Sequence, residues 1–498
     1  MEQYTPLLND TKVNFSSRDS LGIESVFTSI SADLCPIINT VTPRAFYWAF
    51  MCWIYYDFYK NSGIKTYTVS EFDKRYLKRQ DYYFVLANLI ANNSDQFNLV
   101  GKQKAAQDAE NYKPGPYPFN KDYFVTTYGG MQYYNAGCLT MGFITFYDEE
   151  HDNVFKYLPR PTQYGEKMAK AFESVIKDSI YYKEYRLKDE PVPRDVLLEY
   201  GSIINLGMKG FDECKALLRA QLFGRNPSLA LCADYARHIN RLAGNVKLDQ
   251  KNARYFLFDY FSPAGERYSF PNELQASIVG WEIAVGRQYF TTGLEIIWKY
   301  MLQSLTSPST LHEWIDNVLN TAQFSTSLSR TLKTILPSCY FSFNEREVMI
   351  AEARKKKMNV QSVESGLMLS LSIYNRFSGR DDLGDCEKLL DYGKGRVAGR
   401  GSLSLNEWKD LILRYENKTI REFLIYIMEE CIINQHIRTC FDKLTRSSNN
   451  VYGFYFECMG DLYVKNEYGF QVDFQGNRFV QLMQVMDDLD MFDGATGV

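Results

Sequence analysis

The chain has 498 residues, of which 45% are hydrophobic and 15% are aromatic. A chain of this length is too long to form one simple hydrophobic core, and the usual domain size indicates about three domains. The formal net charge of −4 excludes a globally basic nucleic-acid coat, although a local basic patch can still bind phosphates.

The cysteine spacing and the N-terminal sequence indicate the cell compartment in which the protein is expected. Ten cysteines are scattered along the chain without a Cys-x-x-Cys pair, which is typical of buried thiols in a reducing cytosol. Met1–Pro6 lacks the basic and then apolar pattern of a secretory signal. We therefore expect a cytoplasmic protein.

Two helices are predicted near the start of the chain. The first has apolar residues at intervals of three and four, namely Ile23, Val26, Phe27, Ile30 and Leu34. For the second, Thr42 suits the N-cap, Pro43 suits the first helical position, and Phe46, Phe50 and Trp53 share one face. This apolar stretch is shorter than the about 20 residues of a membrane span. We therefore expect a buried helix and no membrane association.

The same region contains two ordered motifs. One is Arg18-Asp19-Ser20-Leu21-Gly22-Ile23, and the other is Thr42-Pro43-Arg44-Ala45, which opens the aromatic run Phe46–Asp57. This order resembles the N-terminus of a family of uncharacterised bacterial proteins, a domain of unknown function in which Arg-Asp-x-Leu-Gly leads to Thr-x-Arg-Ala-Arg-Tyr. The chain departs from it at Phe46, where the family usually has a basic residue. Val485-Met486-Asp487-Asp488-Leu489 is similar to a terminal motif of that family. The resemblance implies a bacterial protein from a mobile-element or anti-phage gene cluster, with no assigned role.

Residues 1–180 are expected to form an N-terminal helical domain. In its later part, a short strand at Val154–Leu158 precedes a helix at Thr162–Ile176 that has Gly165 in its first turn. A strand followed by such a helix is seen in winged-helix domains. A winged-helix element is therefore one interpretation, and ordinary helix packing is the other.

Residues 181–380 are expected to form an all-helical middle domain. From Val192 to Phe377 nearly every segment has an apolar period of 3.6 residues, and strand-like alternation is almost absent. No fixed repeat of about 34 to 47 residues is present, which argues against a regular solenoid.

Residues 381–498 are expected to form a C-terminal α+β domain that is winged-helix-like. Ser404 and Glu407 predict a capping box, and Thr419–Leu444 predicts a long helix. Short strands are predicted at Val451–Glu457, Asp461–Val464 and Phe470–Phe474, before a final amphipathic helix. A plain α+β cap on the core is the alternative.

The expected fold is therefore mainly α. It is an irregular multi-helix array with small winged-helix-like β elements near residues 125–160 and 450–475.

Two local basic tracts are candidates for contact with DNA or RNA phosphates. The first is the run Arg354, Lys355, Lys356 and Lys357, and the second is the Gly393–Gly401 loop with Lys394, Arg396 and Arg400. The loop lacks the spacing of a phosphate-binding P-loop, and no strand precedes it. A solvated helix end and a plain linker are the alternatives for the two tracts.

No motif predicts catalysis, a metal or another cofactor. Cys431, His436 and Cys440 lie in one predicted helix, where their spacing prevents them from converging on one ion. Asp148–Asp152 is interpreted as a solvated loop, and Glu416-Asn417-Lys418 as a chance match to a nuclease motif.

We therefore expect a non-enzymatic subunit of a bacterial anti-phage defence or mobile-element system. It would contact DNA and a larger motor or nuclease protein of the same system. A metal-dependent nuclease and a protein-interaction scaffold without nucleic acid are the alternatives.

Overall fold

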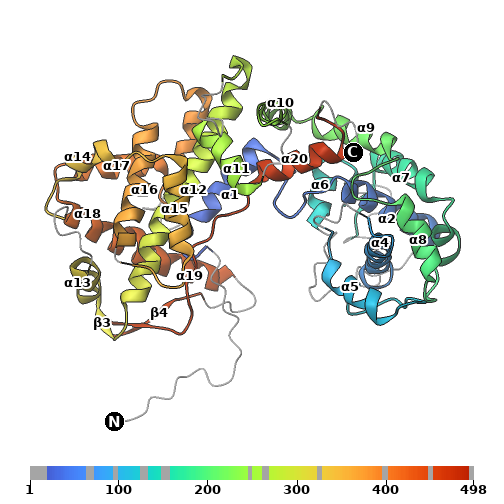
Figure 1. The fold of residues 1–498 in the computed structure, drawn as a ribbon, viewed down its shortest axis with the longest axis horizontal. Coiled ribbons are helices and arrows are strands. Elements are labelled where there is room, and N and C mark those ends of the chain that lie inside the picture. Colours follow the sequence, from blue (N-terminus) through green and yellow to red (C-terminus); the bar gives the residue numbers. More distant parts are fainter. Residues whose placement is uncertain are drawn as a thin grey trace, which may run out of the picture. The chain divides into compact units, whose positions relative to one another are not determined.

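The computed structural model describes residues 19–62, 72–93, 99–123, 133–146, 158–244, 249–260, 269–321, 328–359, 361–394, 402–446 and 453–492. These residues are mainly helical, with two small antiparallel sheets (Figure 1). The fold class expected from the sequence is confirmed, including short strands in both expected regions.

The chain forms two compact units that interleave in sequence. The first unit comprises residues 1–31 and 254–476, and the second comprises residues 32–253 and 477–498. The division at residues 180 and 380 stays a prediction. None of the described helices is both long and apolar enough to cross a membrane.

The second unit is built from short and medium helices. Its elements are α2 (Phe46–Ser62), η1 (Phe72–Leu77), α4 (Lys78–Ile90), α5 (Lys102–Asn111), α6 (Asn135–Thr140), β1 (Ile144–Thr145), β2 (Arg160–Pro161), α7 (Gln163–Ile176), η3 (Tyr181–Tyr185), α8 (Arg194–Ile203), α9 (Asp212–Leu222), α10 (Pro227–Leu242) and α20 (Arg478–Asp488). Two elements continue from one unit into the other, α1 (Glu24–Leu34) and α11 (Gln250–Arg254).

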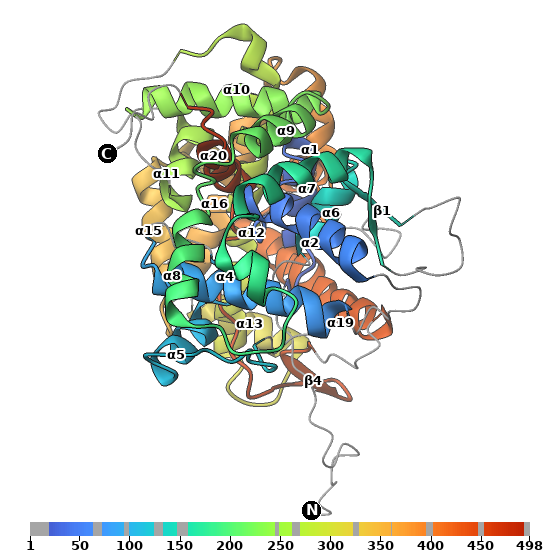
Figure 2. The ribbon, with the colours of Figure 1, turned by 90° about the vertical axis from the view of Figure 1, so that its right-hand side faces the viewer.

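The aromatic helix α2 forms the core of this unit, as predicted. Phe46 stacks on Phe84 of α4, with ring centroids 4.6 Å apart, and Trp53 stacks on Phe172 of α7 at 5.6 Å. All four rings are fully buried, and α2 and α7 run side by side (Figure 2). The predicted start of α2 is wrong, because the helix begins at Phe46. The Thr42 hydroxyl instead accepts a hydrogen bond from the Asn39 N–H.

The first unit is built around one long helix, α12. Its elements are η4 (Tyr255–Asp259), η5 (Asn272–Leu274), α12 (Gln275–Ser304), β3 (Ser309–Thr310), α13 (Leu311–Thr321), α14 (Leu332–Ile335), η6 (Leu336–Ser338), α15 (Phe343–Arg354), α16 (Gln361–Phe377), η7 (Gly384–Asp391), α17 (Leu405–Tyr415), α18 (Ile420–Tyr426), η9 (Ile427–Ile433), α19 (Asn434–Arg446), β4 (Phe456–Met459) and β5 (Leu462–Lys465).

Helix α16 packs along α12 at very short range. A Cβ atom on Gly293 of α12 would lie 2.6 Å from the Gly366 carbonyl oxygen, and one on Gly366 of α16 would lie 2.5 Å from that of Gly293. Only glycine fits both positions, because any side chain would push the two backbones apart. The two helices therefore form a close-packed centre for the unit.

The predicted C-terminal elements are found in part. The Ser404/Glu407 capping box is present, and the predicted long helix is continuous as α18, the π-helical turn η9 and α19. Strands β4 and β5 form a hairpin, and β5 also pairs with β3, which gives the order β3-β5-β4. Phe470–Phe474 is not a strand. The strand predicted at Val154–Leu158 lies almost wholly outside the described residues.

Candidate functional site

The predicted run of four cations begins at the end of α15. Arg354 is the last residue of that helix, and its Nη2 lies 3.5 Å from the Asp473 carboxylate. Lys355 Nζ lies 2.6 Å from the Glu352 carboxylate. These two cations are therefore already paired with carboxylates of the first unit.

The next two residues, Lys356 and Lys357, line a pocket. The pocket has a volume of about 960 Å³ and lies between the C-terminal end of α12, the segment after α15 and the segment after β5. We call it the lysine pocket. It is lined by Lys299, Tyr300, Leu302, Gln303, Ser304, Thr306, Lys356, Lys357, Met358, Lys465, Tyr468, Gly469, Phe470 and Gln471.

Side chains of α12 fix the backbone that carries the two lysines. Lys299 is 1% exposed, and its ammonium donates to the carbonyl oxygens of Ala353 and Lys355 at 2.8 and 2.9 Å. One turn later, the Gln303 amide donates to the Lys356 carbonyl and accepts from the Met358 N–H. The position of Lys356 and Lys357 is therefore built into the fold, although their side chains are exposed.

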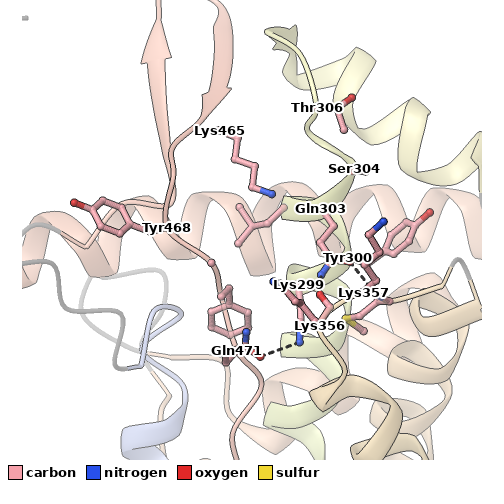
Figure 3. A pocket seen from close by; sticks show the side chains of 14 residues that line it. Lys299, Tyr300, Gln303, Ser304, Thr306, Lys356, Lys357, Lys465, Tyr468 and Gln471 are labelled. Atoms are coloured by element: carbon pink, nitrogen blue, oxygen red, sulfur yellow. Dashed lines mark hydrogen bonds between the residues drawn. The ribbon is translucent and has the colours of Figure 1, made fainter.

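Lys299 also joins two walls of the pocket. Its ammonium donates a third hydrogen bond, 3.2 Å long, to Oε1 of Gln471 (Figure 3). Burial lowers the pKa of Lys299, but three oxygen acceptors hold the charged form. The three donors of this lysine are thus used within the protein.

A third exposed cation comes from the opposite wall. Lys465 is the last residue of β5, and its side chain extends toward α12 (Figure 3). Within the described part of the chain, no carboxylate forms an ion pair with Lys356, Lys357 or Lys465, and none lines the pocket. The pocket thus gathers positive charge that the described residues do not neutralise.

The second predicted tract is not brought to this pocket. Lys394 lies 3.5 Å from the Asp391 carboxylate and does not line the pocket. Arg396 and Arg400 lie outside the described residues. The structure therefore joins two of the seven predicted residues with Lys465 and Lys299.

His436, which shares its helix with Cys431 and Cys440, has a structural role. Its Nδ1–H donates to the Ser20 carbonyl at 3.0 Å, and its Nε2 accepts from the Tyr455 N–H at 3.3 Å. Burial lowers its pKa to about 4, so the ring is neutral. Among the residues that the structure describes, no three His, Cys, Asp or Glu side chains are grouped to hold a metal ion.

The contact with Ser20 gives the N-terminal motif a docking role. The Asp19 carboxylate accepts from the N–H groups of Glu24 and Ser25 and so caps α1. Gly22 has a φ of +65°, and a Cβ there would lie 2.8 Å from the Thr439 hydroxyl of α19. The motif thus turns the chain tightly against α19.

No protein-family model, curated protein or solved structure matches this chain. The resemblance stated from the N-terminal motifs therefore stays a prediction.

Proposed function

We propose that this chain is a non-enzymatic subunit of a bacterial anti-phage defence or mobile-element system, and that it contacts DNA through the lysine pocket. The observation that carries the DNA contact is the gathering of Lys356, Lys357 and Lys465 around a pocket whose described lining has no carboxylate. Lysines bind nucleic acids by neutralising phosphates and releasing counterions. The bacterial system and its larger motor or nuclease partner rest on the N-terminal motifs alone.

The strand order β3-β5-β4 is compatible with a winged-helix domain, a class of domain that often binds DNA. In such domains the strand after the wing lies between the other two, as β5 does here. Helix α13 follows β3, α19 precedes β4, and Trp314 of α13 packs on Phe456 of β4 at 5.7 Å. The exposed side chains of the hairpin include Glu457 and Asp461, which repel phosphates. We therefore assign the DNA contact to the lysine pocket and not to the hairpin.

The experiment measures DNA binding as a function of salt. Fluorescence anisotropy with a labelled DNA, between about 50 and 200 mM salt, compares the wild type with the triple variant Lys356→Gln, Lys357→Gln, Lys465→Gln. Each lost phosphate contact should reduce the slope of log K against log salt by about 0.7 to 0.9. The triple variant should therefore bind more weakly and with a flatter salt dependence.

A matched control removes the same charge elsewhere. Lys167, Lys177 and Lys209 are exposed lysines of the second unit, and their change to Gln should leave the slope unchanged. If the wild type does not bind DNA or RNA at the lowest salt, alone or with its partner, the proposal falls and the scaffold alternative replaces it. A metal-dependent nuclease would be indicated by DNA cleavage that requires added Mg²⁺.

A further inference from the structure

We propose that the lysine pocket takes a single strand of DNA or RNA in preference to a duplex. This inference rests on the proposed function, because it names the form of nucleic acid that the same site binds. Three features of the pocket carry it: the elements that present the lysines, the shape of the site and its aromatic side chains.

The lysines surround a hollow from two sides, a bend and the end of a strand. Lys356 and Lys357 follow the end of α15, and Lys465 ends β5. Base readout in the major groove of a duplex uses a helix or a two-stranded ribbon that enters the groove. Here the lysines line a pocket, so the nucleic acid must enter the protein and not the protein the groove. The two-stranded ribbon of β4 and β5 rises beside this site (Figure 3), but its exposed side chains include Glu457 and Asp461, which repel the phosphates of a duplex.

The size of the pocket suits a few nucleotides. Its volume of about 960 Å³ lies at the upper end of the range of about 300 to 1,000 Å³ for pockets that enclose small ligands. One or two nucleotides fit such a volume, whereas a duplex does not. A strand whose bases are unpaired can place its phosphates on the lysines and turn a base inward.

Aromatic side chains stand beside the cations. Figure 3 shows the Tyr300 ring next to Lys357 on the α12 side. Tyr468 and Phe470 belong to the opposite wall, where Tyr468 is half-buried and Phe470 is 7% exposed. A basic groove with aromatic rings is the usual composition of sites for single strands, because every base can stack on a ring. Tyr300 and Phe470 are 8% and 7% exposed, so the half-buried Tyr468 is the ring most available to a base.

The test compares three probes on the full chain at one salt concentration. They are an oligothymidylate of about 12 nucleotides, an oligouridylate of the same length and a blunt hairpin duplex of about 12 base pairs. We expect both single strands to bind at least about tenfold more tightly than the duplex. The Lys356/Lys357/Lys465 triple variant should weaken their binding.

Tyrosine variants test the stacking step. Tyr468→Leu and Tyr300→Leu should each weaken single-strand binding by about fivefold or more, and Tyr468→Phe and Tyr300→Phe should restore it because they keep the ring. Thermal unfolding of each variant shows whether the fold is kept. The half-buried Tyr468 gives a readout even if Tyr300→Leu does not fold.

The outcomes separate the two proposals. Equal or tighter binding of the duplex overturns the single-strand inference but leaves DNA contact in place. Single-strand binding that the Leu variants do not weaken also overturns it, because the site would then act by charge alone. Failure of all three probes to bind overturns the proposed function itself.

Discussion

Arg44 and Asp488 form a buried ion pair across 444 residues of sequence. Arg44 donates from Nε and Nη2 to the two carboxylate oxygens at 3.0 and 2.9 Å, and the two side chains are 0% and 1% exposed. Asp488 also accepts from the Ala45 N–H at 2.9 Å, at the N-terminus of α2. The pair thus joins α20 to the first turn of α2, where a negative charge is favourable.

Removing the charge of Asp488 should therefore destabilise the second unit. Asp488→Asn leaves the guanidinium of Arg44 buried without its counter-charge, which typically costs about 3–5 kcal/mol. The neighbouring Asp487 is exposed, so Asp487→Asn should change the free energy of unfolding by less than about 0.5 kcal/mol. Chemical denaturation followed by tryptophan fluorescence measures both, and equal effects would contradict the role of the pair.

Trp53→Ala should have an effect of similar size for a different reason. Trp53 is fully buried and lies between Phe50 and Phe172, with centroid distances of 5.6 Å to each. Emptying such a site costs about 3–5 kcal/mol. The control is Leu198→Ala, because Leu198 is 41% exposed. A negligible shift in thermal unfolding for Trp53→Ala would mean that the surrounding rings are not tightly packed.

His436 should make stability depend on pH. Its pKa is lowered by burial to about 4 in the folded chain, against about 6.5 in the unfolded chain. Between these values the unfolded chain binds a proton that the folded chain does not. Stability should therefore fall as the pH falls through this range, by up to about 1.4 kcal/mol per unit, and this contribution is constant above about pH 6.5. His436→Gln does not titrate, so its unfolding free energy should show a smaller slope than the wild type.

Glu295 should act in the opposite direction. Burial and the neighbouring Glu24 carboxyl raise its pKa well above the ordinary value. The contribution of Glu295 to the free energy of unfolding is fully present below about pH 4.5 and is lost as the pH rises. Glu295→Gln keeps a neutral side chain at every pH, so the variant should gain stability relative to the wild type between acidic and neutral pH. The exposed Glu273, changed to Gln, serves as the control, and parallel curves for Glu295→Gln and the wild type would contradict this prediction.

Within the run of four cations, the second pair should matter more for nucleic-acid binding than the first. Arg354 and Lys355 are paired with Asp473 and Glu352, whereas Lys356 and Lys357 line the pocket. The double variants Arg354→Gln, Lys355→Gln and Lys356→Gln, Lys357→Gln remove the same charge. Only the second double variant should reduce the slope of log K against log salt, by about 1.4 to 1.8. Equal slopes for the two variants would show that general charge, and not the pocket, drives binding.

The sequence predicted those features that depend on local patterns. The helical periods, the aromatic face of α2 and the Ser404/Glu407 box each involve residues a few positions apart, so spacing alone specifies them. The predicted N-cap at Thr42 and first helical residue at Pro43 are wrong, because the N–H just before the helix, that of Ala45, donates to Asp488, far along the chain. Local propensity cannot indicate such a partner.

The candidate site could be predicted only in part for the same reason. The run Arg354–Lys357 stands out in the sequence, but its division into paired and unpaired cations depends on Asp473, more than a hundred positions away. Lys465 is an isolated lysine in the sequence, and Lys299 lies within an apolar helix. The one signal for Lys299 was its polarity in that helix, one turn from Gln303.

The ion pair between Arg44 and Asp488 also sets an order of events during synthesis. The carboxylate that neutralises Arg44 is translated 444 residues after it. Chains fold during synthesis from the N-terminal side, but the guanidinium lacks the Asp488 carboxylate until α20 has been made. The second unit can therefore be completed only after residues 254–476 of the first unit have been translated.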